Sequence, residues 1–228
     1  MSTLTTNGLE VSPHFPTSEY ESINSRVQKH WSTHNLYNHF SGSWNALAYR
    51  FHGTVHSGEN FVASLKKYGT APTPFERYLQ EQALFVFFGG AFSALESLFY
   101  GSFAIGAFLN SPAFPLDTPR DQQRVSPSQT IEAFKKAFPA NPILNIFDSV
   151  TCNPSYLQLR EIRNVLTHRT APGRTMYLSI GSEESLATEW KLNNIPIDQS
   201  LVSVRIPELG SLLRELLKGI DEFLVGNT

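Results

Sequence analysis

One segment of this sequence constrains its fold more than any other. From Phe75 to Asn110 the chain contains no proline, and between Ala83 and Leu109 its only charged residue is Glu96. A helix of that length and hydrophobicity is long enough to cross a membrane. However, a charge in mid-segment is costly in lipid, glycine and serine dilute the hydrophobicity, and no basic cluster flanks either end. We therefore predict a central helix that neighbouring helices bury on all sides, with no membrane partner.

Helical periodicity recurs on both sides of this segment. Apolar residues at three- and four-residue steps predict further helices, and Asn153 followed by Pro154 is typical of a helix start. The predicted helices are 43–67, about 128–138 with Ser128 as its cap, a short piece at ILNIF (143–147), one from Asn153 to the TAPG sequence at 170–173, and 207–225, with a proline-rich surface loop at 111–128. The predicted buried stripes are Tyr156, Leu159, Ile162 and Leu166 in the helix after Asn153, and Leu209, Leu213, Leu216, Ile220 and Phe223 in the last helix.

The period changes to two between residues 174 and 196, which predicts a β-hairpin. The alternating residues are Met176, Leu178 and Ile180 before the GSEES sequence, then Leu186, Thr188, Trp190 and Leu192 after it. Residues 1–17 are polar and interrupted by two prolines, so we expect a flexible arm. Residues 18–228 are predicted to form a single domain, a mainly all-α helical bundle with this small β-hairpin as an appendage.

Composition limits the classes of function. The net charge of −2 argues against a broad nucleic-acid-binding surface, although it allows a local cationic site. The single cysteine, Cys152, cannot form an internal disulfide. No basic-then-apolar leader precedes the first helix, and we therefore expect a cytoplasmic protein.

The sequence LREIRNVLTHR, residues 159–169, concentrates cationic and imidazole side chains at the end of one predicted helix. Arg163 and His168 are separated by about 140° of rotation and about 7.5 Å of rise, so they flank a wide groove. Asn164 lies one turn before His168, and Thr167 one turn after Arg163. The guanidinium fork suits phosphate oxygens, and the helix dipole favours an imidazolium in the last turn. Phosphate binding with proton transfer is the chemistry that this set predicts.

Several alternatives remain open. Composition alone makes an Arg-x4-His spacing common, and Arg50 with His56 gives a looser second match, which we set aside because it lies within a helix. Arg163 and His168 could simply solvate a helix end. Glu96 requires either a buried ion pair or hydrogen bond with an arginine, Arg163 or Arg160, or a solvent-filled gap.

Metal and cofactor sites are not predicted. His30 with His34, and His52 with His56, have the i, i+4 spacing that can share a metal, but few acidic residues and no cysteine lie nearby. No glycine-rich phosphate loop, nucleophile elbow or paired-acid motif is present.

The run IRNVLTHR resembles the Arg-x4–6-His signature of the HEPN superfamily, and ALFVFFGGAFSALESLFYG with its single acid resembles the core of that family. The resemblance covers roughly residues 43–170 together with the last helix. It implies a HEPN-like helical bundle that forms a homodimer, with both copies of the motif in one cleft. Many such proteins are metal-independent endoribonucleases of toxin–antitoxin or defence systems, while others bind without catalysis.

The resemblance also implies roles for individual residues. Arg163 would hold the scissile phosphate, His168 would transfer the proton, and Asn164 would orient the phosphate or the histidine, while the RNA 2′-hydroxyl attacks. The supporting residues would be Glu96, Arg160 and Thr167. The expected partners are RNA or a nucleotide, a second copy of the chain, and an antitoxin or other partner protein. The alternative is a non-catalytic dimeric module that binds a nucleotide or a partner protein.

Overall fold

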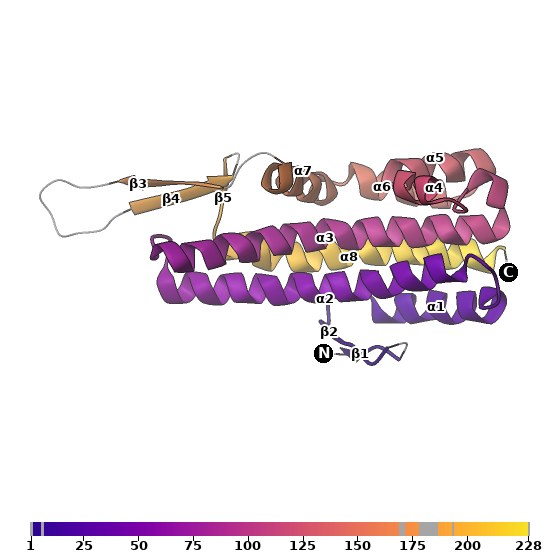
Figure 1. Ribbon diagram of the computed structural model, residues 1–228, viewed down its shortest axis with the longest axis horizontal. Coiled ribbons are helices and arrows are strands. Elements are labelled where there is room, and N and C mark those ends of the chain that lie inside the picture. The colour runs from indigo at the N-terminus through magenta and orange to yellow at the C-terminus, as the bar shows by residue number, and fades with distance from the viewer. Residues whose placement is uncertain (1, 6, 169–171, 178–186, 193, 228) are drawn as a thin grey trace, which may run out of the picture.

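The structure of the protein is a computed structural model that describes residues 2–5, 7–168, 172–177, 187–192 and 194–227. This part of the chain contains helices α1–α8 and two small antiparallel sheets, which confirms the mainly helical fold with a small β appendage. In Figure 1, helices α2 (Tyr37–Tyr68), α3 (Pro74–Leu109) and α8 (Gln199–Val225) run along the length of the molecule. Helices α4 to α7 follow one another along one side of α3.

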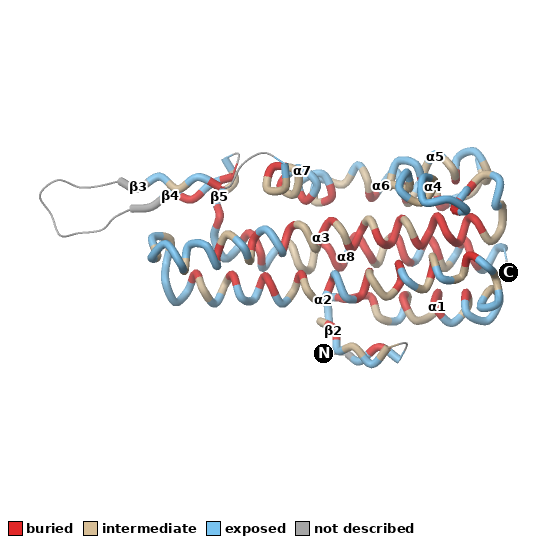
Figure 2. Tube along the Cα trace, viewed as in Figure 1, coloured by how far each residue is buried: buried red, intermediate tan, exposed pale blue. Residues whose placement is uncertain are grey.

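Helices α2 and α3 form a long antiparallel hairpin. Gly69 ends α2 with a φ of 68°, a conformation that glycine adopts without steric cost, and Pro74 occupies the first turn of α3. Of the helices that the structure describes, α3 is the one long and apolar enough to cross a membrane, and 56% of its most apolar 18 residues are buried by the rest of the protein. Figure 2 shows this burial along the middle and far end of α3. The predicted central helix is therefore found, but it is not buried on all sides, since Phe85 and Val86 in its first half are 47% and 43% exposed.

Helix α1 (Thr17–Trp31) was not predicted, because its sequence is mostly polar. It is fixed to α2 by two reciprocal hydrogen bonds. Tyr20 Oη donates to the carbonyl oxygen of Trp44 at 3.1 Å, and Trp44 Nε1 donates to the carbonyl oxygen of Tyr20 at 3.2 Å, with the two rings stacked. Both side chains are buried, so α1 belongs to the core of the bundle.

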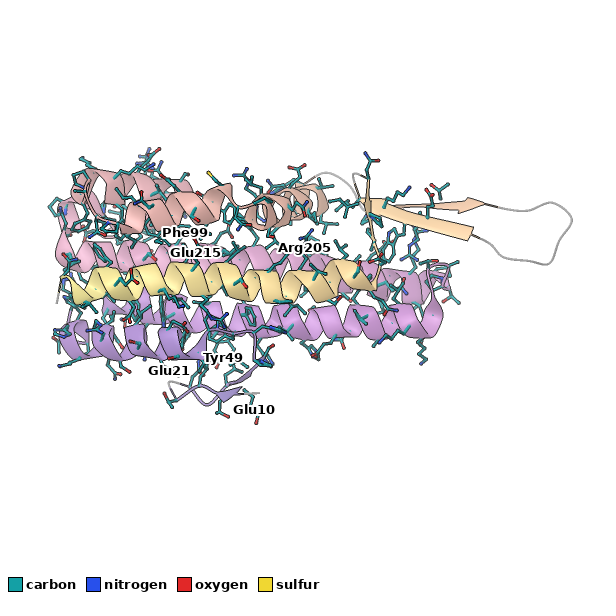
Figure 3. All side chains as sticks on the ribbon, turned by 180° about the vertical axis from the view of Figure 1, so that it is seen from behind. Glu10, Glu21, Tyr49, Phe99, Arg205 and Glu215 are labelled. Atoms are coloured by element: carbon teal, nitrogen blue, oxygen red, sulfur yellow. The ribbon has the colours of Figure 1, made fainter. Side chains whose placement is uncertain are left out.

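The N-terminal residues, predicted to be a flexible arm, pack onto the bundle. Strand β1 (Ser2–Thr3) pairs with β2 (Glu10–Val11), and three apolar side chains of this segment are buried in the core: Leu4, Val11 and Phe15. The carbonyl of His14 lies so close to Gly210 of α8 that an added Cβ would collide with it. Figure 3 shows Glu21 and Tyr49 on the side of the bundle where these strands lie. The prediction missed this packing because the short strands carry too few apolar residues to give a periodic signal.

Five short elements connect α3 to the β appendage: η1 (Ser111–Ala113), α4 (Pro119–Arg124), α5 (Pro127–Ala137), α6 (Ile143–Cys152) and α7 (Pro154–His168). The prediction of a loop at 111–128 missed α4, which begins with a capping box between Thr118 and Asp121. Ser126, two residues before the predicted cap, accepts the hydrogen bond that begins α5. Ser149 of α6 donates to Glu215 of α8 at 2.7 Å, and this hydrogen bond joins the two helices. Figure 3 labels Glu215 on α8.

Helix α8 begins eight residues before the predicted start at Pro207. Its N-cap is Asp198, whose carboxylate accepts hydrogen bonds from the backbone N–H groups of Ser200 and Leu201. The side-chain hydrogen bond from Ser200 is the main reason that the pKa of Asp198 is lowered. Pro207 lies inside the helix. The predicted apolar stripe is confirmed as buried: Leu209, Leu213, Leu216, Ile220 and Phe223.

The predicted hairpin is found where the structure describes it. Strand β3 (Gly173–Tyr177) pairs with β4 (Ala187–Leu192), and β4 pairs with a third, unpredicted strand, β5 (Ile195–Pro196). Asn194, with a φ of 67°, makes the tight turn into β5. The predicted strand positions Leu178, Ile180 and Leu186, and the GSEES turn, lie outside the described residues.

A buried arginine fixes this sheet to the α2–α3 turn. The side chain of Arg174 in β3 is 4% exposed and lies 3.7 Å above the ring of Trp190. It donates hydrogen bonds of 2.9 Å to the carbonyl oxygen of Thr70 and to Gln80 Oε1. Burial is the main cause that lowers the pKa of Arg174, and Glu81 opposes it.

Candidate functional site

Helix α7 carries the predicted motif and is firmly packed. Asn153 Oδ1 accepts a hydrogen bond from the backbone N–H of Ser155 at 2.9 Å, which confirms the predicted cap. The buried side chains of the helix are Tyr156, Leu159, Ile162 and Val165, whereas the predicted Leu166 is only half-buried. The polar residues of the motif are therefore presented from a rigid element.

Arg163 is held at three points around its guanidinium. Its Nη2 lies 3.3 Å from Glu96 Oε1 on α3, and its Nη1 donates to Asn164 Oδ1 at 3.1 Å. Its Cζ lies 5.2 Å from the centroid of the Phe92 ring, within the range of a cation–π contact. The predicted pairing of Glu96 with an arginine of this helix is therefore found, and the partner is Arg163. The pair is not buried as expected, since the side chains are 36% and 25% exposed.

This exposure makes the ion pair a weak contributor to stability. Exposed pairs contribute about 0–1 kcal/mol, far less than the several kcal/mol of a broken buried pair. We therefore expect Glu96→Ala to lower the melting temperature by no more than about 3 °C in a chain of this size. Glu59→Ala, at an exposed position of α2, is the control. A decrease of 10 °C or more in a thermal melt would show that Glu96 has a structural role that this geometry does not reveal.

Thr167 bonds the motif backbone. Its Oγ1 donates to the carbonyl oxygen of Arg163 at 2.7 Å, one turn earlier in α7. The hydroxyl hydrogen is therefore used within the helix and is not directed at the side chains of Arg163 or His168.

His168 is the last residue of α7 and is exposed. Within the described residues, no hydrogen bond joins its imidazole to Arg163 or Asn164. The helical rotation of about 140° between positions 163 and 168 explains the separation of the imidazole from Arg163. One chain thus brings Glu96, Arg163 and Asn164 together and leaves His168 at the exposed end of the helix.

Arg160 is exposed and makes no ion pair with Glu96 in the part of the chain that the structure describes. Its charge instead acts on Tyr156, whose ring packs 5.6 Å from Phe92. Burial raises the pKa of Tyr156 to about 12, Arg160 lowers it and Glu96 raises it. Sequence reasoning placed Tyr156 in the apolar stripe alone. The spacing 156, 160, 163, 167 places all four residues on one face, and this signal could have identified it.

Arg50 was set aside in the sequence but lies close to the site. It lines a surface groove of about 470 Å³ whose wall includes Glu96, on the side of α3 that α2 borders. Arg50 Nη1 donates to the carbonyl oxygen of Ser93 at 3.1 Å and to Ser97 Oγ, the residue after Glu96. No sequence signal could have shown this, since it depends on the register between α2 and α3.

The histidines near the N-terminus do not assemble into a metal site. Among the described residues, no group of three or more His, Cys, Asp and Glu side chains is placed to hold a metal ion. The His34 ring packs 5.0 Å from Phe108 and its Nδ1 accepts from the backbone N–H of Leu36, while His39 Nδ1 bonds Tyr100 Oη at 3.0 Å. These imidazoles thus have partners within the bundle.

Comparisons with known proteins add no assignment. No protein-family model, no curated protein and no solved structure matches this chain.

Proposed function

We propose that this protein is a HEPN-like, metal-independent endoribonuclease, of the toxin or defence type, that cleaves RNA by attack of the 2′-hydroxyl on the adjacent phosphate. The observation that carries the proposal is the guanidinium of Arg163, which Glu96, Asn164 and Phe92 hold at the surface of the helix that also presents His168. A fixed guanidinium suits the negative charge that develops on a phosphate in the transition state. The exposed imidazole of His168 is free to transfer a proton.

In this mechanism the RNA supplies the nucleophile, so the protein needs no serine or cysteine. His168 takes the proton of the 2′-hydroxyl or protonates the leaving 5′-oxygen, and Arg163 stabilises the phosphate. Asn164, which already bonds Arg163, keeps the guanidinium in place.

The test is an assay of metal-stripped protein on RNA. Cleavage should persist in EDTA, and the products should carry a 2′,3′-cyclic phosphate and a 5′-hydroxyl. Loss of activity in EDTA, or products with a 5′-phosphate, would contradict the proposed chemistry.

Because Arg163 and His168 of one chain lie on different sides of α7, the proposal includes a homodimer. Its shared cleft brings together Arg163 of one copy and His168 of the other.

The support for a dimer is an exposed apolar face on the first part of α3 and the end of α2. We call this the α3 apolar face, and its members are 39–67% exposed: Tyr68, Phe75, Tyr78, Leu79, Phe85 and Val86. Side chains of this size present about 150–250 Å² each, so the face exposes on the order of 600 Å². That area approaches the roughly 800 Å² per partner of a stable interface and reaches the upper limit for a monomer's largest patch.

We expect light scattering at micromolar concentration to give twice the chain mass of 25.6 kDa. The double change Tyr78→Lys with Phe85→Lys should give the monomer mass, because it places charges in the α3 apolar face. Tyr49→Lys, at an equally exposed position outside that face, should leave the dimer intact. A wild-type mass of one chain would exclude this assembly.

A non-catalytic module that binds a nucleotide or a partner protein is the second candidate. It is favoured by the hydrogen bonds that the guanidinium of Arg163 already makes to Glu96 and Asn164, because these bonds use donors that a transition-state phosphate would need. Binding of RNA or a nucleotide without cleavage under any condition would support this candidate.

A further inference from the structure

The groove that Arg50 lines is not used by the proposed function. Its lining comes from α2, from α3 and from residues 125–127 at the start of α5. Its volume of about 470 Å³ falls within the range of small-ligand sites, a few hundred to a thousand Å³. Its polar lining residues are Ser43, Arg50, Glu96, Ser97, Tyr100 and Ser126.

Arg50 has a fixed position and unused donors. Both of its hydrogen bonds, to the carbonyl oxygen of Ser93 and to Ser97 Oγ, come from Nη1. Within the described part of the chain, its Nη2 and Nε make no hydrogen bond, and the side chain is exposed to solvent. An arginine that two contacts hold while half of its fork stays free is suited to phosphate oxygens.

Tyr100 forms another wall of the groove. Its hydroxyl bonds His39 Nδ1 at 3.0 Å, which fixes the orientation of the ring. Burial raises the pKa of Tyr100, so its hydroxyl stays neutral beside the groove at ordinary pH. An aromatic side chain next to a phosphate-binding cation is a common arrangement in sites for single-stranded nucleic acid.

Glu96 connects the groove to the candidate site. The carboxylate of Glu96 lines the groove and also pairs with Arg163 on α7. The negative charge of Glu96 is thus balanced by Arg163, and Arg50 leaves the three groups with a net positive charge. Glu96 is therefore shared by the groove that Arg50 lines and by the site that contains Arg163.

We propose that this groove is a subsite for the nucleotide that flanks the scissile phosphate, with Arg50 as its phosphate contact. The inference rests on the proposed endoribonuclease function, because it assigns the groove to the same RNA strand. It adds a residue on α2 to a site that the motif places on α7 alone.

The test measures binding rather than cleavage. A fluorescent 2′-deoxy oligonucleotide, which lacks the attacking hydroxyl, is titrated with wild type and Arg50→Gln over a series of salt concentrations. Loss of one phosphate contact should reduce the slope of log affinity against log salt by about 0.7 for a single strand. Arg120→Gln, an exposed arginine of α4 outside the groove, should leave the slope unchanged. Melting temperatures of both variants establish that the fold is retained.

A second variant does not depend on removing Arg50. Ser126→Asp keeps a good N-cap for α5 and places a negative charge at the groove, so it should weaken oligonucleotide binding without loss of stability. An unchanged slope in Arg50→Gln together with unchanged binding in Ser126→Asp would overturn the proposal.

The outcomes for the two proposals are distinguishable. Oligonucleotide binding that depends on Arg50, in a protein that cuts no RNA, would support the subsite and refute the endoribonuclease. RNA cleavage whose KM and salt slope do not change in Arg50→Gln would support the endoribonuclease and refute the subsite. A 5′-mononucleotide that binds as tightly as the oligonucleotide, with the same dependence on Arg50, would show a free-nucleotide site and contradict the subsite.

Discussion

Replacement of His168 by alanine is expected to lower the turnover of RNA by roughly 10²–10⁴-fold, the usual contribution of a positioned proton-transfer group. His168 is exposed at the end of α7 and is not part of the core, so the variant should fold and melt like wild type. Binding of a 2′-deoxy oligonucleotide should change far less than turnover, since the imidazole acts on the proton and not on the phosphate.

The control for this variant is His56→Ala. His56 is another exposed histidine, lies on α2, and belongs to the Arg50–His56 spacing that we set aside in the sequence. It should retain full activity. Equal losses in both variants, or a loss of binding that matches the loss of turnover in His168→Ala, would remove His168 from the proposed mechanism.

Replacement of Arg163 by alanine is expected to cost at least 10²–10³-fold in turnover, because its guanidinium would meet charge that develops in the transition state. The change also leaves Glu96 without its partner, and the free carboxylate should repel the phosphate. Glu96→Gln in the Arg163→Ala background should therefore recover a small part of the lost affinity, while turnover stays low. Arg163→Lys should restore charge but little activity, since a lysine lacks the planar fork.

Arg160 was expected to support the site, but it makes no pair with Glu96 in the described residues, so Arg160→Ala is the matched control one turn away on α7. Turnover in Arg160→Ala should stay within a few-fold of wild type. Losses of the same size in both variants would indicate a general effect of charge on RNA binding and not a role at the scissile phosphate.

The two inactive variants together test the shared cleft. If each cleft combines Arg163 of one copy with His168 of the other, a mixed dimer of Arg163→Ala and His168→Ala chains contains one intact cleft. Co-expression in equal amounts should then give about a quarter of wild-type activity, because half of the dimers are mixed and half of their clefts are intact. If no activity returns although mixed dimers form, the cleft is not shared.

The long apolar helices were predictable from local features of the sequence. In α8 the periodic stripe from Leu209 to Phe223 agrees with the buried face, whereas α3 was predicted from a long apolar run without proline and not from periodicity. Helix α1 could not be predicted in this way, since a polar sequence is held by the contacts of Tyr20 with Trp44, 24 residues away. The N-terminal segment was missed for the same reason, because its buried residues pack against elements distant in sequence.

The candidate site was predictable only for residues that lie close together in the sequence. Arg163, Asn164 and His168 share one helix, so their spacing could be read from the sequence, and the pairing of Glu96 followed from the cost of an isolated acid in an apolar helix. The partial exposure of that pair was not predictable, because it depends on how far α7 covers α3. The position of Arg50 beside Glu96 depends on the register of the α2–α3 hairpin, which periodicity does not specify.

The most direct test of the central claim uses a 2′-deoxy oligonucleotide that contains a single ribonucleotide. The proposed mechanism predicts that the wild-type protein in EDTA cuts this strand only on the 3′ side of the ribonucleotide and leaves a 2′,3′-cyclic phosphate, and that His168→Ala does not. Cleavage of an all-deoxy strand would contradict the mechanism, because it requires a nucleophile other than the 2′-hydroxyl. An uncut strand, under conditions in which the same oligonucleotide is bound, would show that the site binds without catalysis.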